Sequence, residues 1–134
     1  MTSPRRVSPA EQERLLALGG RTAAVLREAG FRVIAEPDLT GLSDEGGAAI
    51  DVDLFPGGGV YVNWLMNVAW QEEVHRHLTA GEFEHPRVRQ LNAAHAAVRA
   101  ALTAVLSAAG LTVVPSKDDM RPLELQVVET PLED

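Results

Sequence analysis

Two long segments with helical periodicity, residues 8–29 and 86–109, constrain the fold of this chain more than any other feature. The first begins with Ser8-Pro9 and has a glutamate three residues after the serine, which is typical of a helix N-terminus. Each segment ends at an Ala-Gly pair, and a short apolar run follows the glycine. Glycine favours the left-handed conformation that closes a helix. The sequence therefore predicts two long helices, each leading directly into a β-strand.

Shorter segments between and after these helices have the character of strands. Residues 50–54 alternate between apolar and acidic side chains, as expected of a strand with one buried face. The glycine-rich run at 56–59 predicts a hairpin into a second strand at 60–66. Asn67 is placed to cap a short helix at 68–78. Further strands are expected at residues 31–35, 111–114 and 123–129.

The resulting element order, α-β-β-β-α-α-β-β, predicts the α+β class. We expect a mostly antiparallel sheet of about five strands, covered on one face by the two long helices, with the short helix at an edge. One domain is expected at residues 8–129, with a flexible tail at 1–7 and a frayed end at 130–134. Aligning the two Ala-Gly pairs also matches Val25 with Val105, which suggests an α-β-β duplication. The alternative is that helices packed on sheets commonly share such residues.

The element order, the small size and the acidic charge together resemble the dimeric secretion-chaperone-like folds. This resemblance covers element order and size, and no residue motif carries it. A final helix that is common in those folds is missing here. The resemblance implies a dimer that binds another protein, and it implies nothing about chemistry.

Charge and composition exclude several classes of function. The net charge of −7 argues against nucleic-acid partners, whose phosphates attract basic proteins, and against an anionic membrane surface. No apolar run approaches the ~18 residues of a membrane span, and the first residues lack the apolar core of a signal peptide. Of the twelve basic residues only Lys117 is lysine, which suggests a GC-rich bacterial genome. We therefore expect a cytoplasmic protein.

The absence of cysteine and the spacing of the histidines predict that the chain holds no metal and needs no cofactor. All four histidines lie within 21 positions, at His75, His77, His85 and His95. On a helix, His75 and His77 point about 200° apart, so they cannot share an ion. Glu73 and His77 are one turn apart, but no His-Glu-x-x-His pattern is present.

No coherent catalytic set is visible, but one group of residues defines an alternative function. Asp51 and Asp53 share a strand face, and paired carboxylates can perform acid–base chemistry. His95 lies on the apolar side of the second long helix, where a packing role is the simpler interpretation. A small enzyme or small-molecule-binding protein would use residues of this group, which comprises Asp51, Asp53, Tyr61, Trp64 and His95.

The second long helix carries an unusual stripe of small residues opposite its apolar face. An all-small stripe allows another helix to approach closely, either the helix at 8–29 or the helix of a second subunit. Arg99 and its neighbours on the remaining arc are expected to face water, and Tyr61 and Leu65 to lie exposed on the outer face of the sheet. We therefore favour a non-enzymatic protein-binding or regulatory module, chaperone-like and homodimeric. Its interface would contain Tyr61, Leu65, Ala93, Ala97, Ala100 and Ala104.

Overall fold

The computed structural model describes residues 6–34, 46–116 and 124–129, and it confirms the predicted element order. Residues 1–5 and 130–134 of the predicted tails lie outside the described residues. Within these ranges, no helix is both long enough and apolar enough to cross a membrane. The elements are α1 (Pro9–Glu28), β1 (Val33–Ile34), β2 (Gly47–Val52), β3 (Val60–Leu65), α2 (Val68–Thr79), α3 (Pro86–Ala108), β4 (Thr112–Pro115) and β5 (Leu125–Val128).

Side-chain caps begin the helices where the sequence predicts them. The Ser8 hydroxyl accepts a hydrogen bond from Glu11 N, and the Asn67 side chain accepts one from Trp70 N. Proline follows the cap of both long helices, and in α3 the capping residue is His85. Part of the predicted N-terminal tail is anchored, because Val7 N donates to the Leu54 carbonyl over 2.8 Å.

The five strands form one sheet in the order β1-β2-β3-β5-β4. β1 runs parallel to β2, and the remaining neighbours are antiparallel. β3 is therefore the central strand and separates β2 from β5. Its Tyr61 lies between Asp51 of β2 and Gln126 of β5 in the sheet register.

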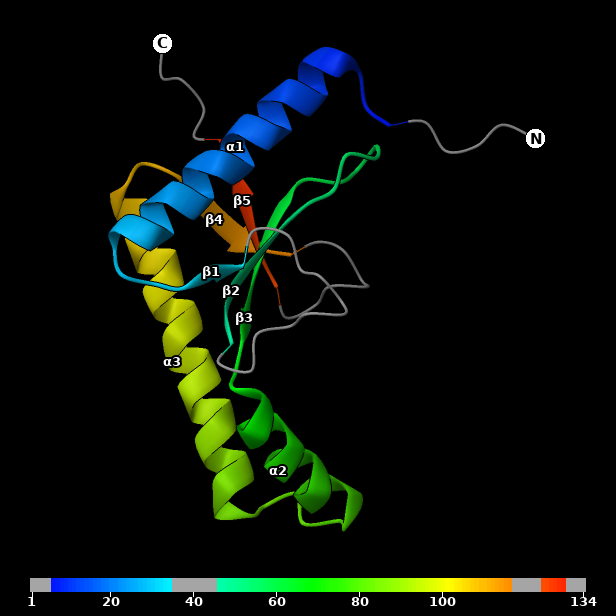
Figure 1. The fold of residues 1–134 in the computed structure, drawn as a ribbon, viewed down its shortest axis with the longest axis vertical. Coiled ribbons are helices and arrows are strands. Elements are labelled where there is room, and N and C mark those ends of the chain that lie inside the picture. Colours follow the sequence, from blue (N-terminus) through cyan, green and yellow to red (C-terminus); the bar gives the residue numbers. More distant parts are fainter. Residues whose placement is uncertain (1–5, 35–45, 117–123, 130–134) are drawn as a thin grey trace, which may run out of the picture.

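The two long helices cover one face of this sheet and enclose the core with it (Figure 1). Leu26 of α1 and Leu102 and Leu106 of α3 are fully buried. Val25 and Val105, which the sequence alignment treats as equivalent, are both partly buried and pack against this core. The sheet contributes the alternate side chains of its inner face, Ala48, Ile50, Val60, Val62, Leu125 and Val127.

The two Ala-Gly helix ends are closely similar, but the similarity stops after the first strand. Gly30 and Gly110 have φ values of 98° and 90°. The residue after each glycine donates its amide to the helix, Phe31 to Leu26 and Leu111 to Leu106. However, β1 pairs in parallel with β2 whereas β4 pairs antiparallel with β5. The structure therefore does not confirm an α-β-β duplication.

A helical hairpin projects from one end of the sheet (Figure 1). It consists of α2, the turn after it and the N-terminal half of α3, and we call residues 68–98 the arm. Within α2, only Val74 is buried. Phe83 in the turn is 64% exposed. The arm thus extends away from the core that stabilises the rest of the molecule.

Candidate functional site

The residues of the predicted small-molecule site do not assemble into one pocket. Asp51 and Asp53 line a depression of about 370 Å³, together with Arg6, Val52, Leu54 and Phe55. Asp53 Oδ1 accepts a hydrogen bond from Phe55 N over 3.0 Å, so this carboxylate stabilises the turn that follows β2. Tyr61, Trp64 and His95 do not line the depression.

Tyr61 and Trp64 point to opposite faces of β3, as the alternation of the strand requires. Trp64 packs on the core, with its ring edge-on to Phe31 at 6.0 Å between centroids, and its indole N–H points at the Met66 sulfur. Tyr61 is 2% exposed, so the expectation that it is exposed on the outer face is wrong. Tyr61 belongs to the central strand, with Asp51 and Gln126 as its neighbours in the sheet register. Leu65, at the end of the same strand, is half-buried.

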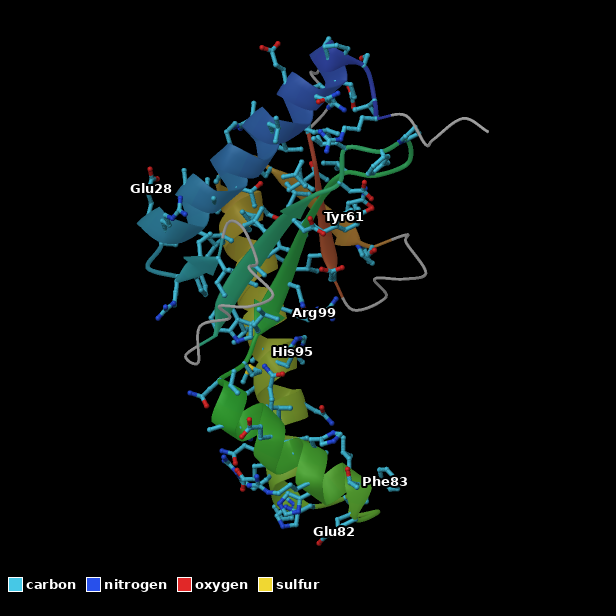
Figure 2. All side chains as sticks on the ribbon, turned by 45° about the vertical axis from the view of Figure 1, so that its right-hand side comes forward. Glu28, Tyr61, Glu82, Phe83, His95 and Arg99 are labelled. Atoms are coloured by element: carbon cyan, nitrogen blue, oxygen red, sulfur yellow. The ribbon has the colours of Figure 1, made fainter. Side chains whose placement is uncertain are left out.

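His95 and Arg99 lie one turn apart on α3, at the end of the arm that joins the sheet (Figure 2). His95 is half-buried, in line with a packing position. Arg99 was expected to face water, and this expectation is wrong. Its side chain is half-buried, and its Nε is buried without a hydrogen-bond partner. Residues three or four positions apart lie on the same side of a helix. His95, Arg99 and Leu102 therefore all lie on the inner side of α3.

The small-residue stripe of α3 is open to solvent. Ala93, Ala97, Ala100 and Ala104 are all exposed, so α1 does not cover them. The sequence left two helices as possible partners of this stripe, and the helix of the same chain is therefore excluded. The small-residue stripe is therefore an exposed and uncharged surface at these four positions.

A larger hollow follows α2 along one side of the arm. It encloses about 760 Å³ and is lined by side chains of α2 and by Leu91 of α3. Its apolar lining includes Leu78, which is 38% exposed. We call this surface the α2 groove, lined by Val68, Gln71, Glu72, Val74, His75, Arg76, Leu78 and Leu91. The sequence does not predict this groove, because it forms only where α2 and α3 lie side by side.

The opposite side of α2 carries an interlocked set of polar and aromatic residues. The Arg87 guanidinium donates from both Nε and Nη2 to the Glu73 carboxylate, at 2.9–3.1 Å. The hydrogen bond from Arg87 lowers the pKa of Glu73 below its usual value of 4.5, and the charge of Arg87 acts in the same direction. This pair joins the two helices of the arm.

His75 and His77 lie on opposite sides of α2, as their helical phases predict. His75 lines the α2 groove, and His77 lies on the other side of the helix, where its ring stacks on that of His85. Their ring centroids are 3.5 Å apart. Helical periodicity does not predict this stack, because the turn after α2 brings the two residues together.

Comparison with protein families, with curated proteins and with solved structures gives no match to this chain. The resemblance to secretion-chaperone-like folds therefore rests on element order and size.

Proposed function

We propose that this protein is a non-enzymatic protein-binding module that acts as a homodimer, and that two copies meet along their α2 grooves. The observation that carries the proposal is the packing of α2, which buries only Val74 within its own chain. Helices in proteins derive most of their stability from the burial of an apolar face. A second copy would provide that burial for Val68, Leu78 and Leu91.

The charges beside the groove support a second copy as the occupant. Glu72 and Arg76 lie symmetrically about Val74, two residues away on either side. Within the described part of the chain, neither residue takes part in an ion pair. Glu72 and Arg76 both line the α2 groove, one turn apart and on the helix side about 200° from Val74. If two α2 helices pack antiparallel on that side, with the two-fold axis level with position 74, Glu72 of each copy faces Arg76 of the other. A two-fold interface has to be self-complementary in this way.

The oligomeric state is the first test. Light scattering on a size-exclusion peak at tens of micromolar should give twice the chain mass of 14.4 kDa. Leu78→Lys should give a folded monomer, because it places a charge in the apolar groove. Leu16→Lys is the matched control, since Leu16 is also an exposed leucine on a helix but lies on α1, and it should stay dimeric. A wild-type mass of 14.4 kDa up to ~100 µM contradicts the proposal.

Charge reversal tests the geometry of the interface. Glu72→Arg and Arg76→Glu should each weaken the homodimer, because each places like charges opposite one another. A mixture of the two variants should form a heterodimer, in which all facing charges have opposite sign. Circular dichroism of each variant controls for loss of helix, because each substitution also places like charges one turn apart on α2.

The alanine stripe of α3 supplies the competing interface. Under the proposal, Ala97→Arg remains a dimer, because Ala97 lies outside the α2 groove. If Ala97→Arg is a folded monomer and Leu78→Lys is a dimer, the copies meet at the stripe and the proposed interface is wrong.

A further inference from the structure

The turn between α2 and α3 gathers three side chains of types that bind metal ions. His77 comes from the last turn of α2, Glu82 from the connecting turn and His85 from the cap of α3. One potential ligand atom from each residue lies within 4.8 Å of the other two. We call this group the His-Glu-His cluster. It is on the side of α2 that faces away from the α2 groove.

We infer that the His-Glu-His cluster is a site for a divalent transition-metal ion of the zinc class. Imidazole nitrogens and a carboxylate oxygen are the ligands that zinc takes in proteins without cysteine. Three protein ligands leave a fourth position for water or for a group from a partner. The inference does not depend on the proposed dimer, because all three ligands belong to one chain.

The distance between two of the ligands already suits one ion. His77 Nδ1 and Glu82 Oε1 are 3.3 Å apart. Two ligands at 2.0–2.1 Å from a tetrahedral zinc ion are about 3.3 Å apart as well. The two ligand atoms are therefore already at the spacing that one zinc ion requires.

The third ligand needs a local rearrangement. The His77 and His85 rings are stacked at an angle of 19°. A metal ion lies in the plane of each ring that binds it, so the rings have to rotate out of the stack. His85 Nδ1 also accepts a hydrogen bond from Arg87 N over 3.1 Å. A neutral imidazole has one unprotonated nitrogen, so binding a metal exchanges this cap bond for the metal bond.

The backbone holds the three positions in place during such a change. Glu82 N donates to the His77 carbonyl over 2.9 Å, and His85 N donates to the Glu82 carbonyl over 3.2 Å. Gly81 takes a φ of 78° between them, a conformation that glycine adopts without strain. Only side-chain rotations are therefore needed, and the exposed Glu82 leaves the cluster open to an ion from solution.

Calorimetry with zinc chloride is the main test, on protein purified without a histidine tag and stripped with a chelator. We expect one zinc ion per chain, and a tenfold or greater loss of affinity in His77→Ala and in Glu82→Gln. His85→Asn should lose affinity equally while keeping an acceptor at the cap. His75→Ala is the matched control, since His75 is an exposed histidine of the same helix, and it should bind as the wild type does.

The backbone amide of Arg87 gives an independent readout. In an NMR titration with zinc its resonance should shift in step with the binding, because it loses its His85 acceptor. Leu78→Lys, the variant expected to be monomeric, should bind zinc with the wild-type affinity. Zinc binding and dimer formation can therefore be tested independently. Absence of stoichiometric binding at millimolar zinc overturns the inference, and so does an equal loss in His75→Ala.

Discussion

Arg87 lies over the indole ring of Trp70, with its guanidinium carbon 4.7 Å from the ring centroid. The same guanidinium donates two parallel hydrogen bonds to Glu73, so one residue of α3 holds two residues of α2. The arm has few buried residues, and this contact replaces part of the packing that a larger core would supply. Arg87 is therefore the residue that most directly fixes the angle between the two helices of the arm.

Substitution of Arg87 should destabilise the arm. Arg87→Lys keeps the charge but loses the bidentate geometry and the planar stacking, so it should behave more like Arg87→Ala than like the wild type. The cation–π contact alone is worth about 0.5–1 kcal/mol. Urea denaturation should show a lower midpoint for both variants. Arg89→Ala, an exposed arginine two residues away, should denature at the wild-type midpoint.

The Glu73–Arg87 pair should also make stability depend on pH in the acid range. The pKa of Glu73 is lowered in the folded chain, so its ion pair stabilises fully above the usual value of 4.5. This stabilisation is lost as the pH falls through the lower, folded pKa. Urea midpoints of the wild type and Glu73→Gln should differ by a constant amount above about pH 5.5 and converge below pH 4.5. If the difference between the two urea midpoints increases as the pH falls, the Glu73–Arg87 pair is not the source of the pH dependence.

Local chemistry explains why most of the fold is predictable from the sequence. The caps at Ser8 and Asn67 and the closing glycines Gly30 and Gly110 form within a few residues, so sequence spacing determines them. The alternation of residues 60–64 likewise places Trp64 on the core face of β3. These interactions involve neighbours along the chain or a single sheet face.

Contacts between distant segments explain what the sequence could not predict. The burial of Tyr61 depends on β3 being central, and strand order is not encoded in the alternation of one strand. Arg99 is half-buried although its helical phase predicts exposure, because other segments of the chain pack beside it. The His-Glu-His cluster combines residues five and eight positions apart through a turn, whereas the analysis of the histidines compared positions on one helix.

Val25 and Val105 should contribute equally to stability, since both are partly buried against the same core. Truncation of either to alanine should cost about 1–3 kcal/mol, from lost burial and a small cavity. Leu106→Ala should cost about 2–5 kcal/mol, because Leu106 is fully buried. Leu16→Ala, at an exposed position of α1, should stay near the wild type. The equivalence is wrong if either valine variant denatures at the wild-type midpoint.

Adjacent glycines in α1 should respond to substitution in opposite ways. A Cβ atom at Gly20 meets nothing within 4 Å, whereas one at Gly19 would lie 2.6 Å from Val52 Cγ2. Gly20→Ala should therefore stabilise the protein by about 0.5–1 kcal/mol, through the higher helix propensity of alanine. Gly19→Ala should destabilise it by about 1–3 kcal/mol, because the stiff valine forces α1 away from the sheet.

A double-mutant cycle shows whether this close approach is the cause. Val52→Ala removes the methyl group that Gly19→Ala would meet, so the two substitutions together should cost less than the sum of their separate effects. The same cycle with Gly20→Ala and Val52→Ala should be additive, since Gly20 has no neighbour within reach of a Cβ atom. If Gly19→Ala and Val52→Ala are additive in urea denaturation, the contact between α1 and β2 at Gly19 does not set the helix-to-sheet distance.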